Sequence, residues 1–214
     1  MVMNIEGMAQ RYMAQMREIK GRVAVLREMT ASPAFDMDLA GIRQIVQLEG
    51  IALQLRKVLE LLVFSSLVAN QNRLREMTRD GSLVNFHYAK KLLAQLEILH
   101  PEFFPLAGDV TERGPRTHIS IGHLDAFTKD DFIELYDLCS DRLHVWNPFR
   151  AQEAVIDWGR PITEWVDRIE NLLRFHVVCM WGGDRLLCTM SDERKGGDVS
   201  LTLARPQRTL EPSS

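Results

Sequence analysis

The chain has 214 residues, of which 46% are hydrophobic and 26% are charged, and its formal net charge at pH 7 is -3. This balance excludes a disordered chain, and it excludes the strongly basic composition of a protein that coats nucleic acid. The length fits one domain with a full core, and RNA binding would need a local basic patch.

Cysteine usage and hydropathy bear on the compartment. The three cysteines are an odd number and have no C-x-x-C spacing, so neither a disulfide framework nor a zinc site is predicted. The most apolar run, "LLVFSSLVA" at 61 to 69, is less than half the length that crosses a bilayer, and the first residues do not resemble a secretory signal. We therefore expect a cytoplasmic protein with no membrane partner and no cofactor.

Two long helices are predicted first. Between residues 3 and 29, apolar side chains recur at spacings of three and four and form one helical face: Met8, Tyr12, Met16, Ile19, Val23 and Leu26. Pro33 interrupts this pattern. A second helix is predicted from about residue 38 to 77, at the centre of the domain. Its expected inward residues are Ile42, Ile45, Leu48, Leu55, Leu59, Leu62 and Leu67.

The middle of the chain is less regular. Residues 86 to 100 predict a shorter amphipathic helix that Pro101 ends. Prolines and glycines are spread through residues 101 to 127, where "THISI" suggests one strand. Thr128 is predicted to cap the next helix, with Asp131 three residues later. The expected buried face of that helix is Phe132, Leu135, Cys139 and Leu143.

In the last third of the chain the spacing of apolar residues changes from three and four to two. A helix from about 161 to 174 has an early proline and an apolar face of Ile162, Trp165, Val166, Ile169 and Leu173. "FHVVCMW", "DRLLCTMS" and "DVSLTLA" then alternate with period two and predict three strands. The expected fold is mainly α (α+β): residues 1 to 174 form a helical bundle, 175 to 204 a three-stranded antiparallel meander on the same domain, and 205 to 214 a frayed tail.

One stretch has a candidate catalytic pattern. Tyr136, Ser140 and His144 follow one another at four-residue intervals, which permits a hydrogen-bond chain along one helical stripe. Such a chain would fix the imidazole tautomer and let His144 act as a general acid or base near neutral pH. In the alternative interpretation, His144 binds the last carbonyls of its helix, while Tyr136 and Ser140 satisfy one another at a helix contact.

Charged and aromatic groups give candidate binding residues. Arg56, Lys57 and Glu60 either surround an anionic ligand or a partner, or they pair with one another at a helix interface. Aromatic residues gather in the later part of the chain, where they form a platform for bases or pack that segment onto the bundle. They are Trp146, Phe149, Trp158 and Trp165.

Two other candidates are a metal site at the histidine pair and a nucleophile at Cys139, and neither is predicted to act. His118 and His123 would face opposite sides of a strand, with Asp125 as the only other ligand type nearby, so no metal site is predicted. Cys139 shares the predicted core face with Leu135, and a buried thiol is inert.

The central "LQLRKVLELLVFSSLVAN" and the later "LYDLCSDRLHVWNPF" resemble the HEPN-like group of helical domains found in bacterial conflict systems. Tyr136, Ser140 and His144, followed by Asn147 and Pro148, carry the resemblance, which covers about residues 40 to 150. It implies an up-and-down bundle of four or five helices, frequent dimerisation and, in active members, a metal-independent endoribonuclease.

The catalytic pair of active HEPN-like members is an Arg and a following His at the start of a helix, with four to six residues between them. The matches in this chain are Arg113 with His118 and Arg116 with His123, in a segment that is Gly-Pro or strand-like. Arg142 and His144 are only two positions apart. The chain therefore resembles the group without a clear catalytic pair.

Three functions follow from these observations. The first is an interaction or regulatory protein of a toxin-antitoxin or defence system, a homodimer through the long helix, with a protein or RNA partner that Arg56, Lys57, Glu60, Trp146 and Asn147 would contact. The second is an endoribonuclease in which His144, Ser140 and Tyr136 handle the proton, while Arg142 or Arg56 offsets phosphate charge. The third is a small-ligand sensor with its pocket between bundle and meander.

Overall fold

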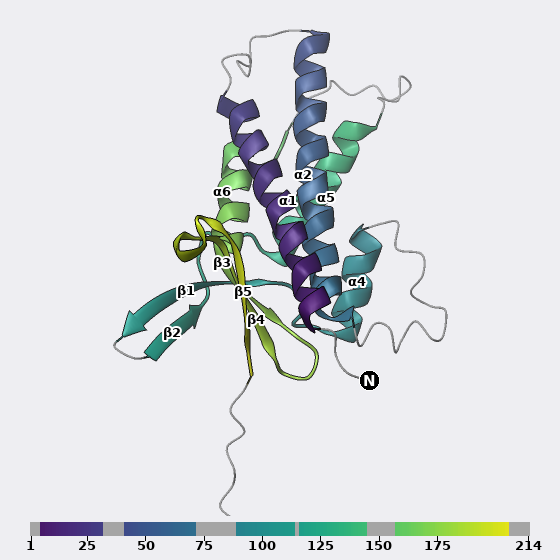
Figure 1. Cartoon of the computed structure of the whole chain (residues 1–214). Coiled ribbons are helices and arrows are strands. Elements are labelled where there is room, and N and C mark those ends of the chain that lie inside the picture. The colour runs from purple at the N-terminus through teal and green to yellow at the C-terminus, as the bar shows by residue number, and fades with distance from the viewer. Residues whose placement is uncertain (1–4, 32–40, 72–88, 114–115, 145–156, 206–214) are drawn as a thin grey trace, which may run out of the picture.

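A computed structural model describes residues 5–31, 41–71, 89–113, 116–144 and 157–205. Five helices lie in these ranges: α1 (Ile5–Ala31), α2 (Ile42–Ala69), α4 (Ala89–Leu99), α5 (Lys129–Leu143) and α6 (Ile162–Leu173). The strands are β1 (Leu106–Arg113), β2 (Arg116–Ile121), β3 (Phe175–Cys179), β4 (Arg185–Asp192) and β5 (Asp198–Ala204), with the 3-10 turn η2 (Glu193–Lys195) before β5. The helices gather above the sheet (Figure 1), so the predicted α+β class is confirmed.

Helix α1 buries the face that its sequence predicts. All six residues of the predicted apolar face are buried, and Tyr12, Met16, Ile19 and Leu26 are 0% exposed. The buried positions recur every three or four residues, which keeps them on the side of α1 that faces the other helices and the sheet.

Helix α2 confirms only part of its prediction. Leu48, Leu55 and Leu59 are buried as expected. The prediction that Ile42 and Ile45 point inward is wrong, because 71% and 47% of their surface is exposed. Figure 1 shows the reason: the N-terminal end of α2 extends past the end of α1, so its first turns lack that neighbour. Residues 38 to 40 and 72 to 77 of the predicted helix lie outside the described ranges.

The sheet has five strands, so the predicted three-stranded meander was an undercount. The strand order is β2-β1-β3-β4-β5, and every neighbouring pair is antiparallel. The two strands outside the predicted meander come from residues 106 to 121, inside the range assigned to the bundle: β2 confirms the strand suggested at "THISI", and β1 was missed. Strand β1 was not predicted in part because it contains Gly108, and glycine in a sequence is interpreted as a turn signal. Here a Cβ on Gly108 would lie 2.8 Å from the Ser120 carbonyl oxygen, so the strand needs glycine for close approach.

The β1–β2 hairpin diverges from the rest of the sheet. Strand β1 pairs with β3 only at Leu106 and Ala107, whereas it pairs with β2 from Gly108 to Arg113. Strand β3 begins at Phe175, directly after α6 ends, and so offers β1 no further partner. The outer part of the hairpin therefore extends away from β3, β4 and β5 (Figure 1).

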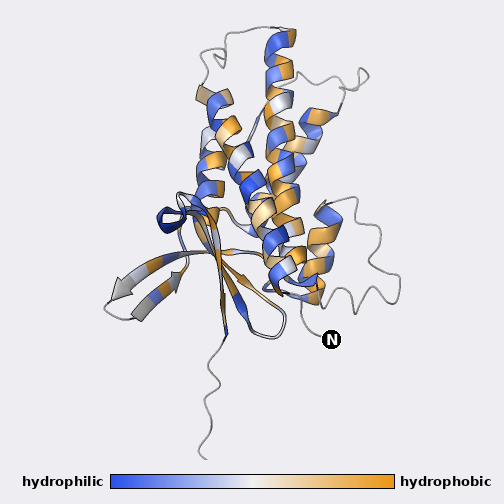
Figure 2. Cartoon of the chain, viewed as in Figure 1, coloured by the Kyte–Doolittle hydropathy of each residue, from blue (hydrophilic) through white to orange (hydrophobic). Residues whose placement is uncertain are grey.

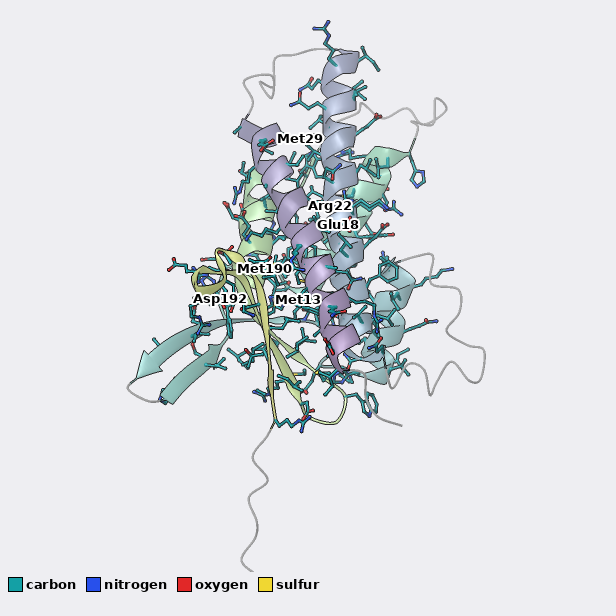
Figure 3. The ribbon with its side chains drawn as sticks, viewed as in Figure 1. Met13, Glu18, Arg22, Met29, Met190 and Asp192 are labelled. Carbon is teal, nitrogen blue, oxygen red and sulfur yellow. The ribbon has the colours of Figure 1, made fainter. Side chains whose placement is uncertain are left out.

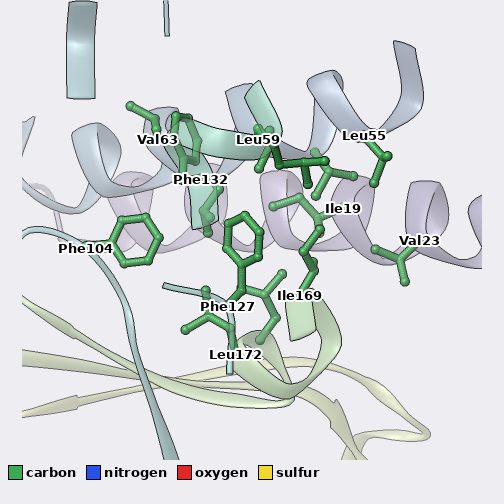
Figure 4. Close-up of a cluster of buried hydrophobic side chains, with 14 of the residues drawn as sticks. Ile19, Val23, Leu55, Leu59, Val63, Phe104, Phe127, Phe132, Ile169 and Leu172 are labelled. Carbon is green, nitrogen blue, oxygen red and sulfur yellow. The ribbon is translucent and has the colours of Figure 1, made fainter. Parts of the chain in front are cut away.

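One hydrophobic core joins the helices to the sheet. Helices α1 and α6 pack on the strands, α2 packs on α1, and α4 and α5 pack on α2. Figure 4 shows Phe127 and Phe132 between residues of α1, α2 and α6, including Ile19, Leu59 and Ile169. Apolar residues follow the inner faces of the helices in Figure 2. In the described ranges, no helix combines the length and the apolar content needed to cross a bilayer.

A buried polar contact joins the first helix to the sheet. The Tyr12 hydroxyl lies 2.8 Å from His176 Nε2, and both side chains are 0% exposed. His176 Nδ1 lies 3.0 Å from the Leu173 carbonyl oxygen at the end of α6. His176 therefore connects α1, α6 and β3 at one point.

Candidate functional site

Helix α5 carries most of the candidate catalytic residues, and its start is fixed by a capping box. The Thr128 side chain accepts from the backbone N–H of Asp131, and the Asp131 carboxylate accepts from the backbone N–H of Thr128 at 2.8 Å. This confirms the predicted N-cap. The same carboxylate accepts from Arg168 Nη2 at 2.7 Å, so α5 is also tied to α6.

The centre of α5 meets α2 at a polar cluster around Arg56. The guanidinium of Arg56 donates to the Tyr136 hydroxyl at 3.0 Å and to the Ser140 hydroxyl at 3.2 Å. Its Nε donates to Glu60 at 3.2 Å. The guanidinium carbon lies 4.8 Å from the centre of the Tyr136 ring, within range of a cation–π interaction. Lys57 also donates to Glu60 at 3.2 Å.

The cluster around Arg56 contains five of the predicted site residues but not His144. The five are Arg56, Lys57, Glu60, Tyr136 and Ser140. Ser140 donates to the Tyr136 carbonyl oxygen at 2.8 Å, and the Tyr136 hydroxyl accepts from Arg56. His144 is the C-cap of α5 and has φ -91° and ψ 138°, so its backbone has already left the helix. The side chain is exposed, and no hydrogen bond joins it to another described residue.

The two arginines predicted to offset phosphate charge, Arg142 and Arg56, have partners other than His144. Arg142 donates to the Asp157 carbonyl oxygen at 2.8 Å, and its guanidinium carbon lies 5.7 Å from the centre of the Trp158 ring. Arg56 is held by Glu60. The predicted binding residues Trp146 and Asn147 lie outside the described residues.

The remaining nucleophile and ligand candidates have a structural role or an exposed position. Burial raises the pKa of the Cys139 thiol to about 12, although the nearby Arg56 and Arg142 lower it. A thiol with this pKa stays protonated and packs as a small apolar group. His118 is exposed on β2. Among the described residues, no three His, Cys, Asp or Glu side chains lie close enough to hold a metal ion.

A surface that sequence reasoning missed lies on the N-terminal half of α2. Four large apolar side chains there are exposed: Ile42 by 71%, Ile45 by 47%, Val46 by 58% and Leu53 by 43%. We call them the α2 stripe. They follow spacings of three, four and seven, which place them on one face, opposite the buried Leu48 and Leu55. The available signal was that α2 is apolar on two opposite faces, only one of which its own domain can cover.

Comparison with known proteins found no matching family model, no matching curated protein and no matching solved structure.

Proposed function

We propose that this protein is an interaction module that works as a homodimer assembled through the α2 stripe. One observation carries the proposal: four large apolar side chains share one exposed face of a helix that extends past its neighbour. Contiguous exposed apolar surface on a globular protein marks interaction sites, because burying each Å² of it is worth about 25 cal/mol.

A second copy of the chain is the occupant that this surface suits. Between Ile42 and Leu53 the helix has only two charged residues, Arg43 and Glu49, so two copies can pack together without burying many charges. In an antiparallel pairing, Ile42 of each protomer would lie against Leu53 of its partner, and the two stripes would cover one another. This is a self-complementary contact of the kind that twofold dimers use.

The resemblance to HEPN-like domains supports the same proposal, because members of that group frequently dimerise. It also suggests a toxin-antitoxin or defence setting, with a protein or an RNA as the further partner. The three cysteines are free thiols, which supports a reducing, cytoplasmic compartment.

Replacing Val46 with Asp is expected to convert the dimer into a monomer. The substitution would place two carboxylates in the apolar contact, where burial of an unpaired charge is unfavourable. Multi-angle light scattering after gel filtration measures the change as a halving of the molar mass. Val46 is 58% exposed in the single chain, so the variant should still fold as a monomer.

Val25→Asp is the matched control, because Val25 is an exposed valine on a different helix, at 43% exposure. This variant should remain a dimer. A wild-type chain that is monomeric at micromolar concentrations, or a Val46→Asp variant that stays dimeric, would contradict the proposal.

The endoribonuclease remains a separate prediction with a direct test. Total RNA is incubated with wild type and with His144→Ala in the presence of EDTA, and cleavage is followed on a gel. His144 is exposed, so the substitution should leave the melting temperature unchanged and loss of activity would not reflect unfolding. Cleavage by the wild type that disappears in the variant would assign His144 a catalytic role. Equal cleavage by both proteins would remove it.

A further inference from the structure

A large hollow lies where the β1–β2 hairpin diverges from the sheet. Its volume is about 1040 Å³, at the upper end of the range of roughly 300 to 1,000 Å³ for small-molecule sites. Side chains of α1, the end of α6 and all five strands line it. We call it the hairpin groove. Figure 3 shows Met190 and Asp192 at the end of β4, where the strand comes close to α1.

The walls of the hairpin groove are largely apolar. Ile19 and Val23 come from α1, and Phe175 and Leu187 from the sheet. Val110 and Ile119 face each other across the β1–β2 hairpin, and 44% and 39% of their surface is exposed. The hairpin thus presents an open apolar wall that neither α1 nor α6 covers.

Most charged groups in the hairpin groove are already paired. Asp109 accepts from Arg174 at 3.1 Å. Glu170 pairs with Arg27. Arg194 donates to Asp192 at 3.0 Å. A divalent cation therefore has no unpaired carboxylate among these groups to bind.

Lys20 differs from the other charged groups. Its ammonium donates to the carbonyl oxygens of Met190 at 3.1 Å and Gly197 at 2.5 Å, and no carboxylate forms an ion pair with it in the described part of the chain. The nearby Asp198 accepts two hydrogen bonds from Arg17, at 2.9 and 2.7 Å. Lys20 is half-buried beside the apolar wall. Its charge helps to lower the pKa of Asp198, but that carboxylate accepts its hydrogen bonds from Arg17 and forms no ion pair with Lys20 in the described part of the chain.

We propose that the hairpin groove binds a small amphipathic anion, with an apolar chain along Val110 and Ile119 and its carboxylate at Lys20. The ammonium has three donors, of which two are used by carbonyl oxygens, and the third is available to the ligand. A hydrogen bond between two charged groups at a partly buried site would then add to the apolar contact. This site is separate from the α2 stripe, so it does not depend on dimerisation.

Decanoate is a suitable probe, because it has an apolar chain, a single carboxylate and enough solubility for titration below its micelle concentration. Isothermal titration calorimetry compares it with decyltrimethylammonium, which has the same chain and the opposite charge. The full-length protein should bind decanoate at one site and should bind the cation at least tenfold more weakly.

Two variants locate the site. Lys20→Gln should weaken decanoate binding about tenfold or more, because it removes a charge-assisted hydrogen bond, while Lys20→Arg should keep most of the affinity. Ile119→Asp should weaken binding by a similar factor, because it places a negative charge in the apolar wall. Melting temperatures of all variants show whether each one is folded.

The matched controls are Lys91→Gln on α4 and Leu124→Asp, a 99% exposed leucine outside the groove, and both should bind as the wild type does. No binding of decanoate to the wild type would overturn the proposal. Equal binding of the two probes, or wild-type affinity in folded Lys20→Gln and Ile119→Asp, would overturn it as well.

Discussion

Lowering the pH from 6.5 to 4 is expected to reduce the free energy of unfolding by about 3 kcal/mol through His176 alone. Burial lowers the pKa of His176 to about 4, against an ordinary value of 6.5, and the Leu173 carbonyl opposes the shift only in part. Each unit of difference between the folded and the unfolded pKa corresponds to about 1.4 kcal/mol.

The hydrogen bonds of His176 explain why the folded protein needs its neutral form. The Leu173 carbonyl oxygen can only accept, so Nδ1 must carry the hydrogen. Nε2 is then the acceptor of the hydrogen bond from the Tyr12 hydroxyl. A second proton on Nε2 would remove that acceptor and create a charge at a site that is 0% exposed.

The direction of the pH effect follows from these two pKa values. In the unfolded chain His176 takes up a proton near pH 6.5, whereas in the folded protein it does so only near pH 4. As the pH falls below 6.5, protonation of His176 therefore stabilises the unfolded chain, while the folded protein keeps the neutral imidazole until about pH 4. The contribution of His176 to stability is complete above pH 6.5 and is lost progressively as the pH falls to 4.

Urea unfolding at pH 7, 6, 5 and 4.5 measures this loss, with His176→Gln as the comparison. Glutamine can accept from Tyr12 but does not titrate, so the stability of this variant should change less with pH than that of the wild type. At pH 7 the variant should be less stable than the wild type. The pKa values of Asp192 and Asp198 are lowered to about 2, chiefly by hydrogen bonds from Arg194 and Arg17, so these groups act at lower pH. Parallel pH profiles of wild type and variant would contradict the prediction.

Asp131→Ala is expected to destabilise the protein by about 3 kcal/mol, at the low end of the cost of breaking a buried ion pair. The Asp131 side chain is 8% exposed and that of Arg168 is 17% exposed. Burial raises the pKa of Asp131, but hydrogen bonds from Arg168 and Thr128 outweigh it and lower the pKa overall. Truncation would remove the capping box of α5 and leave Arg168 without its carboxylate.

The matched control is Asp130→Ala, one position earlier in the first turn of α5. Asp130 is exposed, so its loss should cost no more than about 0.5 kcal/mol through the helix dipole. Chemical unfolding of the three proteins at pH 7 gives the differences directly. Equal effects of the two substitutions would show that the contact between Asp131 and Arg168 contributes nothing beyond the local charge.

Several features follow from residues close together in the chain, and the sequence by itself determines them. The buried face of α1 follows from apolar spacing within one helix. The cap of α5 follows from Thr128 and Asp131, which are three positions apart. The strands β3 to β5 follow from short apolar runs, of which β4 buries alternate positions and β3 buries four residues in succession. In each case the decisive interaction or period spans only a few residues, so no knowledge of distant neighbours is needed.

The candidate site shows the limit of such local reasoning. The spacing of Tyr136 and Ser140 on one helical stripe could be read from the sequence, but their common partner Arg56 lies 80 residues before Tyr136. His144 was placed on the same stripe by its spacing, although its backbone has left the helix. Only packing of α2 against α5 decides which polar groups meet.

Tertiary structure alone also decided which apolar residues are covered. Helix α2 has apolar side chains on two opposite faces, and its neighbours cover Leu48 and Leu55 while leaving Ile42 and Val46 exposed. Strand β1 exists because Gly108 permits close approach to Ser120, which glycine in a sequence does not reveal. The hairpin groove forms because β3 begins too late to pair with the rest of β1. Each outcome depends on contacts between distant segments. The spacing of hydrophobic residues in one segment indicates only which of them could be buried, not which neighbours cover them.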